Sequence, residues 1–161
     1  MASATPPSAE MERHAYQISH LISGFTVPMM RKLYHQFDGD MVEIIVLGEI
    51  SLRNVDRFFR KGGADVPEKL LDDAERRGKL LQPCNVLSIA EATGIPRETV
   101  RRKVAHLIEK GWLTRDERKR LIVKKGAGER FVKANAKAAV DILELAAKIQ
   151  SLLRPVNTDR D

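Results

Sequence analysis

The chain has 161 residues, of which 43% are hydrophobic and 31% charged, and its formal net charge is +6. This length suffices for one good hydrophobic core, with or without helical extensions. A single cysteine, Cys84, excludes an intramolecular disulfide and a zinc site built from several cysteines. No apolar run approaches membrane-spanning length, and the N-terminus lacks the features of a secretory signal, so we expect a cytoplasmic chain with no membrane partner.

The positive charge is concentrated in one segment of the chain. Residues 94–133 contain thirteen Lys or Arg against five acidic residues, a local net charge of +8, so the remaining chain sums to −2. Such a concentration is typical of a surface that follows nucleic-acid phosphates. A run of charge is more often a solvated helix face, so charge alone leaves both interpretations open.

The N-terminal third of the chain is expected to be helical. Residues 1–9 are rich in Pro, Ser, Thr and Ala and should form a disordered tail. Residues 10–62 should form a helical region that serves the core or dimerisation. Within it, apolar side chains recur at helical spacing from Ala9 to about Phe25, and a second short helix is expected from Pro28 to Phe37.

A longer helix should follow the break at Gly39. The segment Asp40-Met-Val-Glu43 has the form of a capping box, in which Asp40 caps backbone donors and Glu43 reaches back to the backbone. The helix should run to about Lys61, and its largely apolar circumference predicts a central, buried position. Residues 63–83 are expected to be a charged linker with a short helix from Pro67 to about Arg77.

Residues 84–126 carry the pattern of two short helices joined by a glycine. Ser88-Ile-Ala-Glu91 has the form of a second capping box, which predicts that the first helix starts at Ser88. Gly94 permits a left-handed turn, and Pro96 presets φ at the start of the second helix. Four apolar residues of the second helix share one face and should pack into the core: Val100, Val104, Leu107 and Ile108.

A β-hairpin is expected directly after these helices. Trp112–Arg115 and Arg120–Val123 are short apolar segments that flank four polar residues. A helix-turn-helix followed at once by a hairpin is a winged helix. The predicted fold class is therefore mainly α with a small β-hairpin wing, a winged helix-turn-helix flanked by N- and C-terminal dimerisation helices.

The C-terminal region, residues 127–154, is expected to form one long Ala-rich helix starting at about Gly128, with a tail over residues 155–161. One face repeats with a 3-4 alternation over three heptads: Phe131, Asn135, Ala138, Ile142, Leu145, Ile149 and Leu152. This alternation favours helix–helix packing, within the subunit or across a dimer. Whether the face pairs two copies or covers its own domain stays open at this point.

The start of the second motif helix is predicted to contact DNA. Arg97, Glu98, Arg101 and Arg102 are expected in the major groove, because guanidinium groups match guanine acceptors and a carboxylate can accept from cytosine. Thr99 and Lys103 are better placed for phosphates. The hairpin cations should enter the minor groove or grip the flanking backbone: Arg115, Arg118, Lys119 and Arg120. The alternative is a winged helix used for protein contact, which the local concentration of positive charge disfavours.

Other chemistries find little support in the sequence. Cys84 is expected to be a buried structural residue rather than an oxidation sensor, and the four histidines are too scattered for a metal site. The chain contains no nucleophile elbow, phosphate-binding loop, zincin helix or dinucleotide fingerprint. We therefore expect a non-enzyme without a cofactor.

The segment from about residue 80 to 130 resembles the MarR-type multiple-drug-resistance regulators and their wider winged-helix relatives. The resemblance rests on Ile89-Ala90, Gly94, Thr99–Arg102, Leu107 and Glu109–Leu113, followed by a basic hairpin. It implies that the N- and C-terminal helices interlock into a homodimer, which binds a pseudo-palindromic site on double-stranded DNA. It also implies a small-molecule effector that binds between the dimer helices and the winged domain. The function expected is that of a sequence-specific duplex-DNA-binding transcriptional regulator.

Overall fold

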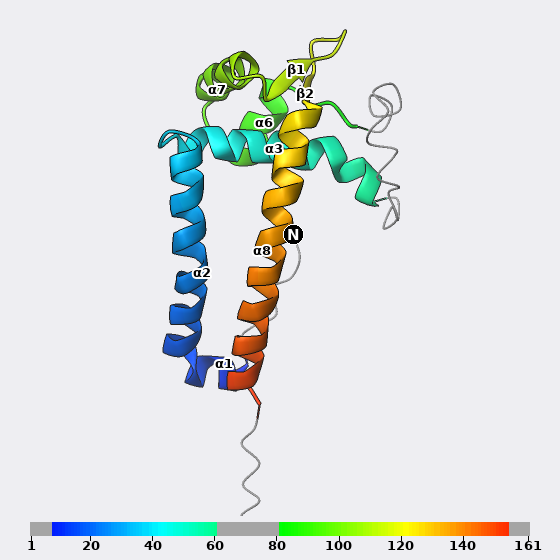
Figure 1. The fold of residues 1–161 in the computed structure, drawn as a ribbon. Coiled ribbons are helices and arrows are strands. Elements are labelled where there is room, and N and C mark those ends of the chain that lie inside the picture. Colours follow the sequence, from blue (N-terminus) through cyan, green and yellow to red (C-terminus); the bar gives the residue numbers. More distant parts are fainter. Residues whose placement is uncertain (1–7, 61–80, 155–161) are drawn as a thin grey trace, which may run out of the picture. The chain divides into compact units, whose positions relative to one another are not determined.

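The computed structural model describes residues 8–60 and 81–154 of the chain (Figure 1). The chain divides into two compact units. Residues 36–132 form one unit, which we call the winged domain, and residues up to His35 together with those from Lys133 onward form the other, the helical unit. The helix expected from Pro67 to Arg77 lies outside the described residues.

The helical unit begins with two helices, α1 (Ala9–Arg13) and α2 (Ala15–Gln36). The sequence predicted that this region would contain a break before Pro28, and that prediction is wrong, because α2 runs past Pro28 without interruption. A proline inside a helix leaves the carbonyl four residues earlier without its N–H partner. Here that carbonyl belongs to Gly24, which is exposed, so water can satisfy it.

The long C-terminal helix is α8 (Lys125–Leu152), which starts three residues before the predicted Gly128. Its last turns and the first turns of α2 line one hollow that includes Tyr16, Leu21, Lys148 and Leu152, so the two helices lie together at that end. None of the described residues of the helical unit is buried.

The first helix of the winged domain is α3 (Met41–Arg60), and the end predicted for it at about Lys61 lies outside the described residues. The Glu43 N–H donates to Asp40 Oδ1 at 2.9 Å, so Asp40 caps the helix as expected. The second half of the predicted capping box is wrong. The Asp40 N–H donates instead to the Phe37 carbonyl, and the Glu43 side chain is buried against another helix.

The central position predicted for α3 is confirmed for one of its faces. Val46, Leu47 and Ile50 are fully buried, whereas Ile45 and Leu52 on the other side are half or more exposed. The helix packs against both helices of the helix-turn-helix and against the hairpin. It is thus part of the winged domain, whereas the sequence grouped its residues with the N-terminal helices.

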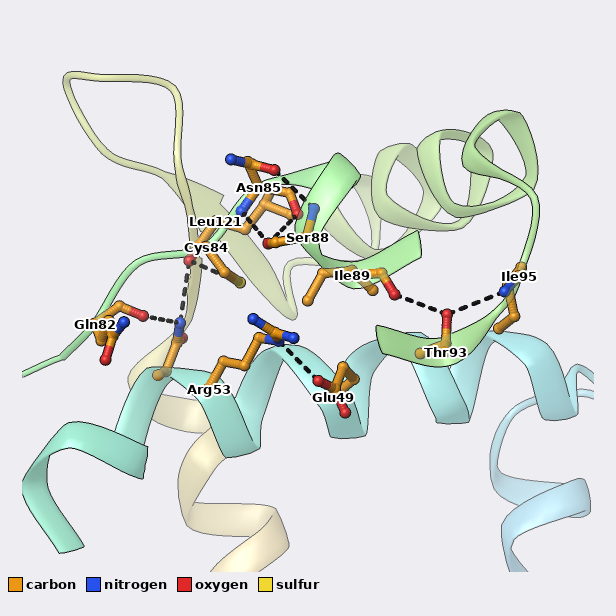
Figure 2. Close-up of polar contacts among 11 residues, drawn as sticks. Glu49, Arg53, Gln82, Cys84, Asn85, Ser88, Ile89, Thr93, Ile95 and Leu121 are labelled. Atoms are coloured by element: carbon orange, nitrogen blue, oxygen red, sulfur yellow. Dashed lines mark hydrogen bonds and ion pairs between the residues drawn. The ribbon is translucent and has the colours of Figure 1, made fainter. Parts of the chain in front are cut away.

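The first helix of the motif is α6 (Val86–Thr93), and it begins two residues before the predicted Ser88. Asn85 is the capping residue: its side chain accepts from the Ser88 N–H at 2.9 Å, and the Ser88 hydroxyl accepts from the Asn85 N–H at 3.3 Å (Figure 2). Ser88 is therefore the third residue of the helix, and the capping box predicted from Ser88 to Glu91 is wrong. Asn85 caps because it holds the extended conformation that precedes a helix, with φ −132° and ψ 168°.

The turn and the second helix agree with the sequence prediction. Gly94 lies in the left-handed region with φ 69°, and its N–H donates to the Ala90 carbonyl. The second helix, α7 (Arg97–Glu109), follows directly after Pro96. Gly111, with φ 76°, allows the chain to turn away from α7 into the hairpin.

The wing consists of two antiparallel strands, β1 (Leu113–Arg115) and β2 (Leu121–Val123), in which Leu113 pairs with Val123. Cys84 pairs with Leu121 on the other side of β2, so the segment before α6 extends this small sheet by one bridge. The mostly helical chain with one two-stranded hairpin confirms the predicted winged helix-turn-helix fold.

One hydrophobic core joins α3, α6, α7 and the hairpin. Its fully buried apolar residues come from all of these elements: Val46, Leu47, Ile50, Ile89, Val100, Val104, Leu107, Leu113 and Leu121. This core fixes which side of α7 faces outward.

Candidate nucleic-acid interface

The second helix of the motif, α7, which we call the recognition helix, is held by one apolar face. Val100, Val104 and Leu107 are fully buried in the core, and Ile108 packs beside them. Because these positions share one face of the helix, the residues between them are turned outward. Arg97, Glu98, Arg101 and Arg102 are all exposed, as the sequence predicted.

Two of these arginines are unpaired in the described part of the chain. Arg97 and Arg102 are exposed, and neither has an ion-pair or hydrogen-bond partner among residues 8–60 and 81–154. Their guanidinium groups therefore need not break an existing interaction before they bind an anion. Arg97 lies in the first turn of α7, and Arg102 follows five residues later.

Glu98 and Arg101 bind each other. Arg101 donates from Nε to Glu98 Oε2 at 2.8 Å and from an Nη to Oε1 at 2.6 Å, which is the two-pronged geometry of a guanidinium on a carboxylate. The paired guanidinium lowers the pKa of Glu98 below its ordinary value. Both side chains are more than 60% exposed, so the pair lies at the surface of the domain.

Lys103 occupies a different environment from the other cations of α7. Its ammonium group donates to Asp40 Oδ2, which lies at the N-terminus of α3, and both side chains are about three-quarters buried. Lys103 thus ties α7 to α3 rather than lying free on the outer face. Thr99, the other residue assigned to phosphates, is half-buried beside the core residue Val100.

The wing tip is organised by Asp116. Its Oδ1 accepts from the backbone N–H groups of Arg118 at 3.0 Å and Arg120 at 2.7 Å, which closes the turn. Partial burial acts to raise the pKa of Asp116, but the hydrogen bonds from Arg120 and Arg118 outweigh it and hold the pKa below 3.8. Lys119 completes the turn with a left-handed φ of 58°.

The four wing cations fall into two groups. Arg118 and Lys119 are exposed at the tip, and their side chains have no ion-pair partner in the described residues. Arg120 is paired, because its Nε lies 2.7 Å from Asp116 Oδ2. Arg115 donates to the Lys119 carbonyl at 3.0 Å, a neutral partner that leaves its charge uncompensated. The wing therefore presents three uncompensated cations, Arg115 at the end of β1 and Arg118 and Lys119 at the tip.

The sequence did not predict that the buried carboxylate of Glu43 has two partners at the end of α7. Glu43 is fully buried, with His106 Nδ1 3.0 Å from its Oε2 and Lys110 Nζ 3.5 Å from its Oε1. Lys110 also lies 3.7 Å from Asp38. The capping pattern assigned Glu43 a local role, and no local signal indicates that its partners lie more than sixty residues away.

Asn54 is the second residue that the sequence did not reveal. It lies on α3, is 1% exposed, and its side-chain amide bonds the main chain of two other segments. Nδ2 donates to the carbonyls of Gln82 at 3.1 Å and Leu121 at 3.2 Å, and Oδ1 accepts from the Val123 N–H at 2.9 Å. The available signal was its position, because Asn54 follows Ile50 by four residues and Leu47 by seven and so falls on the apolar face of α3, where a buried amide needs such partners.

Cys84 is buried with 8% of its surface exposed. Desolvation is the main cause that raises the pKa of its thiol from 9.0 to about 11, despite the nearby Arg53 guanidinium. A thiol with a raised pKa is a poor nucleophile, which favours the structural role expected for Cys84 over an oxidation sensor.

A cavity of about 730 Å³ lies between the second half of α3 and the segment that leads into α6. Its lining combines the apolar residues Leu52, Val55 and Pro83 with the ion pair between Arg53 and Glu49, in which Nε lies 2.7 Å from Oε1 (Figure 2). Its volume lies in the range of small-molecule sites, whereas its lining is more polar than is usual for them. Among residues 8–60 and 81–154, no group of three or more His, Cys, Asp or Glu is arranged to hold a metal ion.

No helix among the described residues is both long enough and apolar enough to cross a membrane.

In comparisons with known proteins, residues 79–117 match the family model of the IclR helix-turn-helix domain. No curated protein and no solved structure matches the chain. The matched residues span α6, α7 and β1, the elements that present the exposed arginines. The chain therefore carries a helix-turn-helix domain of the DNA-binding kind found in transcription regulators, and the comparison does not single out the MarR type.

Proposed function

We propose that this chain is a sequence-specific transcription regulator that binds duplex DNA as a homodimer. The observation that carries the proposal is the outward face of α7, where Arg97, Arg101 and Arg102 stand exposed within the segment that matches a DNA-binding helix-turn-helix. The apolar side of the same helix is buried against the core, so the basic face is the one available to a partner.

In this proposal the arginines of α7 read the major groove. A guanidinium can donate two parallel hydrogen bonds to guanine O6 and N7. Arg97 and Arg102 are free to do so, while Arg101 is held in place by Glu98. The uncompensated cations of the wing, Arg118 and Lys119 at the tip, would hold the phosphates or minor groove beside the site.

The homodimer is supported by the composition of the helical unit. It has no buried residue within its described part, yet α8 exposes Ile142 and Leu143, and α2 exposes Val27 and Met30. Exposed apolar residues of this extent are typical of an interaction surface, and the 3-4 alternation on α8 suits pairing with another helix. A two-fold axis would place two recognition helices about 34–36 Å apart, one turn of DNA.

A small-molecule effector belongs to the same proposal. The cavity beside α3 is lined by Pro83, Cys84 and Asn85, which lie in the segment that pairs with β2 and caps α6. A ligand in the cavity would contact that segment directly and could shift the motif relative to the wing. We propose no catalytic role and no cofactor, because the sequence carries no recognised catalytic motif. We also propose that the protein acts in the cytoplasm, where it would meet the DNA.

The proposal is tested with DNA fragments selected from a random pool by the wild-type protein. We expect the selected site to be pseudo-palindromic, and Arg101→Ala/Arg102→Ala to bind it at least about tenfold more weakly with a smaller salt dependence. Arg31→Ala/Lys32→Ala removes the same charge from exposed positions of α2 and is the matched control. If the wild type selects no sequence, or the α7 variant binds as tightly as the control, a winged helix that contacts protein becomes the better explanation.

A further inference from the structure

Besides the apolar packing of the core, one side chain of α3 hydrogen-bonds the main chain of the wing. The amide of Asn54 donates to the Leu121 carbonyl and accepts from the Val123 N–H, so it bonds the first and last residues of β2. The same amide donates to the Gln82 carbonyl, and the Asn54 main-chain carbonyl accepts from the Gln82 N–H at 2.8 Å. The Asn54 side chain thus makes three hydrogen bonds, all of them to main-chain groups.

The two segments bonded by Asn54 are neighbours in space. Cys84 and Leu121 exchange main-chain hydrogen bonds, with the Leu121 N–H 2.7 Å from the Cys84 carbonyl. Figure 2 shows Gln82, Cys84 and Leu121 close together above α3, beside the Asn85 cap of α6. Asn54 therefore lies where the wing, the start of the helix-turn-helix and α3 meet.

The recognition helix has separate attachments to the same scaffold. Val100, Val104 and Leu107 bury its apolar face, and Lys103 pairs with Asp40 at the far end of α3. None of these interactions involves Asn54. A change at Asn54 can therefore affect the placement of the wing while α7 keeps its own support.

We propose that Asn54 is the positioning residue of the wing, and that it sets the register between the wing tip and the recognition helix on DNA. This inference rests on the DNA-binding function proposed above. The chemistry favours Asn at this position, because an apolar residue would remove both the acceptor that Asn54 offers to the Val123 N–H and the donor that it offers to the Gln82 carbonyl. Aspartate would fit the same space but would direct an acceptor at both carbonyls.

Amide hydrogen exchange in the free protein tests, without DNA, whether Asn54 holds the wing in place. In Asn54→Ser we expect at least about tenfold faster exchange at Val123, whose N–H no longer has its acceptor, with the α7 amides little changed. Gln82→Ala is the matched control, because Asn54 contacts Gln82 only through its main chain. Equal acceleration in α7 and the wing would mean that Asn54 supports the whole domain, and would overturn the inference.

DNA binding by Asn54→Asp tests the functional half. On a duplex selected by the wild type, we expect protection from backbone cleavage to disappear at the flanks contacted by the wing and to persist at the centre. The slope of log affinity against log salt should fall by about 0.9 for each phosphate that the wing no longer neutralises. Disappearance of central and flanking protection together would contradict a positioning role.

Asn54→Ser replaces Asn54→Asp in these measurements if the aspartate variant is too unstable to fold. A further comparison combines a change at Asn54 with removal of the cations at the wing tip. Removing the tip cations by Arg118→Ala/Lys119→Ala should weaken binding in the wild type but add little when Asn54 is already changed. Full additivity would overturn the inference. If the wild type binds no duplex while Val123 still exchanges faster in Asn54→Ser, the DNA-binding proposal fails, but the role of Asn54 in holding the wing stands.

Discussion

The buried carboxylate of Glu43 on α3 lies 3.0 Å from the imidazole Nδ1 of His106 on the recognition helix. Glu43 is fully buried, whereas the His106 side chain is 48% exposed. Lys110 Nζ is 3.5 Å from the other Glu43 oxygen, which has no hydrogen bond of its own within the described part of the chain. His106 is thus the group that supplies a hydrogen bond to a carboxylate otherwise held by charge alone.

This relationship predicts that the stability lost on removing His106 is partly restored when the charge of Glu43 is removed as well. His106→Ala should destabilise the domain by about 1–3 kcal/mol, because it leaves a buried carboxylate short of a partner. Glu43→Gln keeps the shape of the side chain and should restore part of the stability when it is combined with His106→Ala. Urea unfolding of the four proteins measures the effect, and a double variant less stable than His106→Ala would contradict it.

The Asp40–Lys103 pair predicts a dependence of stability on pH. Desolvation acts to raise the pKa of Asp40, but the hydrogen bonds from Lys103 and the Glu43 N–H outweigh it and hold the pKa below 3.8. The folded state then binds its proton less readily than the unfolded chain, so the stabilisation is present above pH 3.8 and is lost as pH falls through the lowered pKa.

Asp40→Asn isolates this ion pair, because Asn caps a helix about as well as Asp. At pH 7 we expect the wild type to be more stable by up to about 1 kcal/mol, and the difference should shrink towards pH 3. Unfolding free energies at pH 7, 5 and 3 provide the measurement. A difference that is constant over this range would show that the charge of Asp40 contributes nothing.

The turn of the helix-turn-helix predicts a penalty of purely backbone origin at Gly94. Its φ is 69°, and a Cβ placed there would meet no atom within 4 Å. Gly94→Ala should therefore cost about 1–2 kcal/mol through the left-handed conformation alone, and Gly94→Asn should cost less. Gly48→Ala, at an equally open position inside α3, is the control and should be neutral or stabilising. Equal effects at both sites would contradict this reasoning.

The raised pKa of Cys84 predicts slow thiol chemistry in the folded protein. A pKa of about 11 in place of 9.0 lowers the thiolate population at pH 8 by about a hundredfold. Reaction with a maleimide should therefore be at least that much slower in buffer than in concentrated urea, and burial slows it further. Comparable rates in the two solutions would reveal an accessible, reactive thiol.

The proposed dimer predicts that a charge on the apolar face of α8 separates the subunits. Ile142 is 49% exposed and belongs to the 3-4 alternation. Sedimentation at micromolar concentration should give a dimer for the wild type and a monomer for Ile142→Glu. Glu144→Lys, on the opposite side of the helix at an exposed position, should remain dimeric. A monomeric wild type would remove the dimer from the proposed function.

The local features of this protein followed from its sequence. Gly94 between two apolar helical patterns predicted the turn, and the short apolar segments on either side of Asp116 predicted the wing. These signals are strong because a left-handed glycine and a short hairpin each involve only a few neighbouring residues. The exposure of the arginines of α7 followed from the helical spacing of its apolar residues, since burial of Val100 and Val104 decides which residues face outward.

Where a local pattern had two solutions, tertiary contacts decided between them. Both Asn85 and Ser88 can cap α6, and the pairing of Cys84 with Leu121 accompanies the extended backbone that makes Asn85 the cap. Glu43 could have bonded its own helix end, but it faces His106 and Lys110 across the core.

The sequence by itself determined the winged helix-turn-helix and the position of its basic residues. Only the tertiary structure decided which of those cations are free, since Lys103 pairs with Asp40, 63 residues away. It alone revealed Asn54, whose partners on β2 lie 67 and 69 residues along the chain. The physical reason is that buried polar groups must find partners wherever the fold brings them, and sequence spacing carries no record of that search.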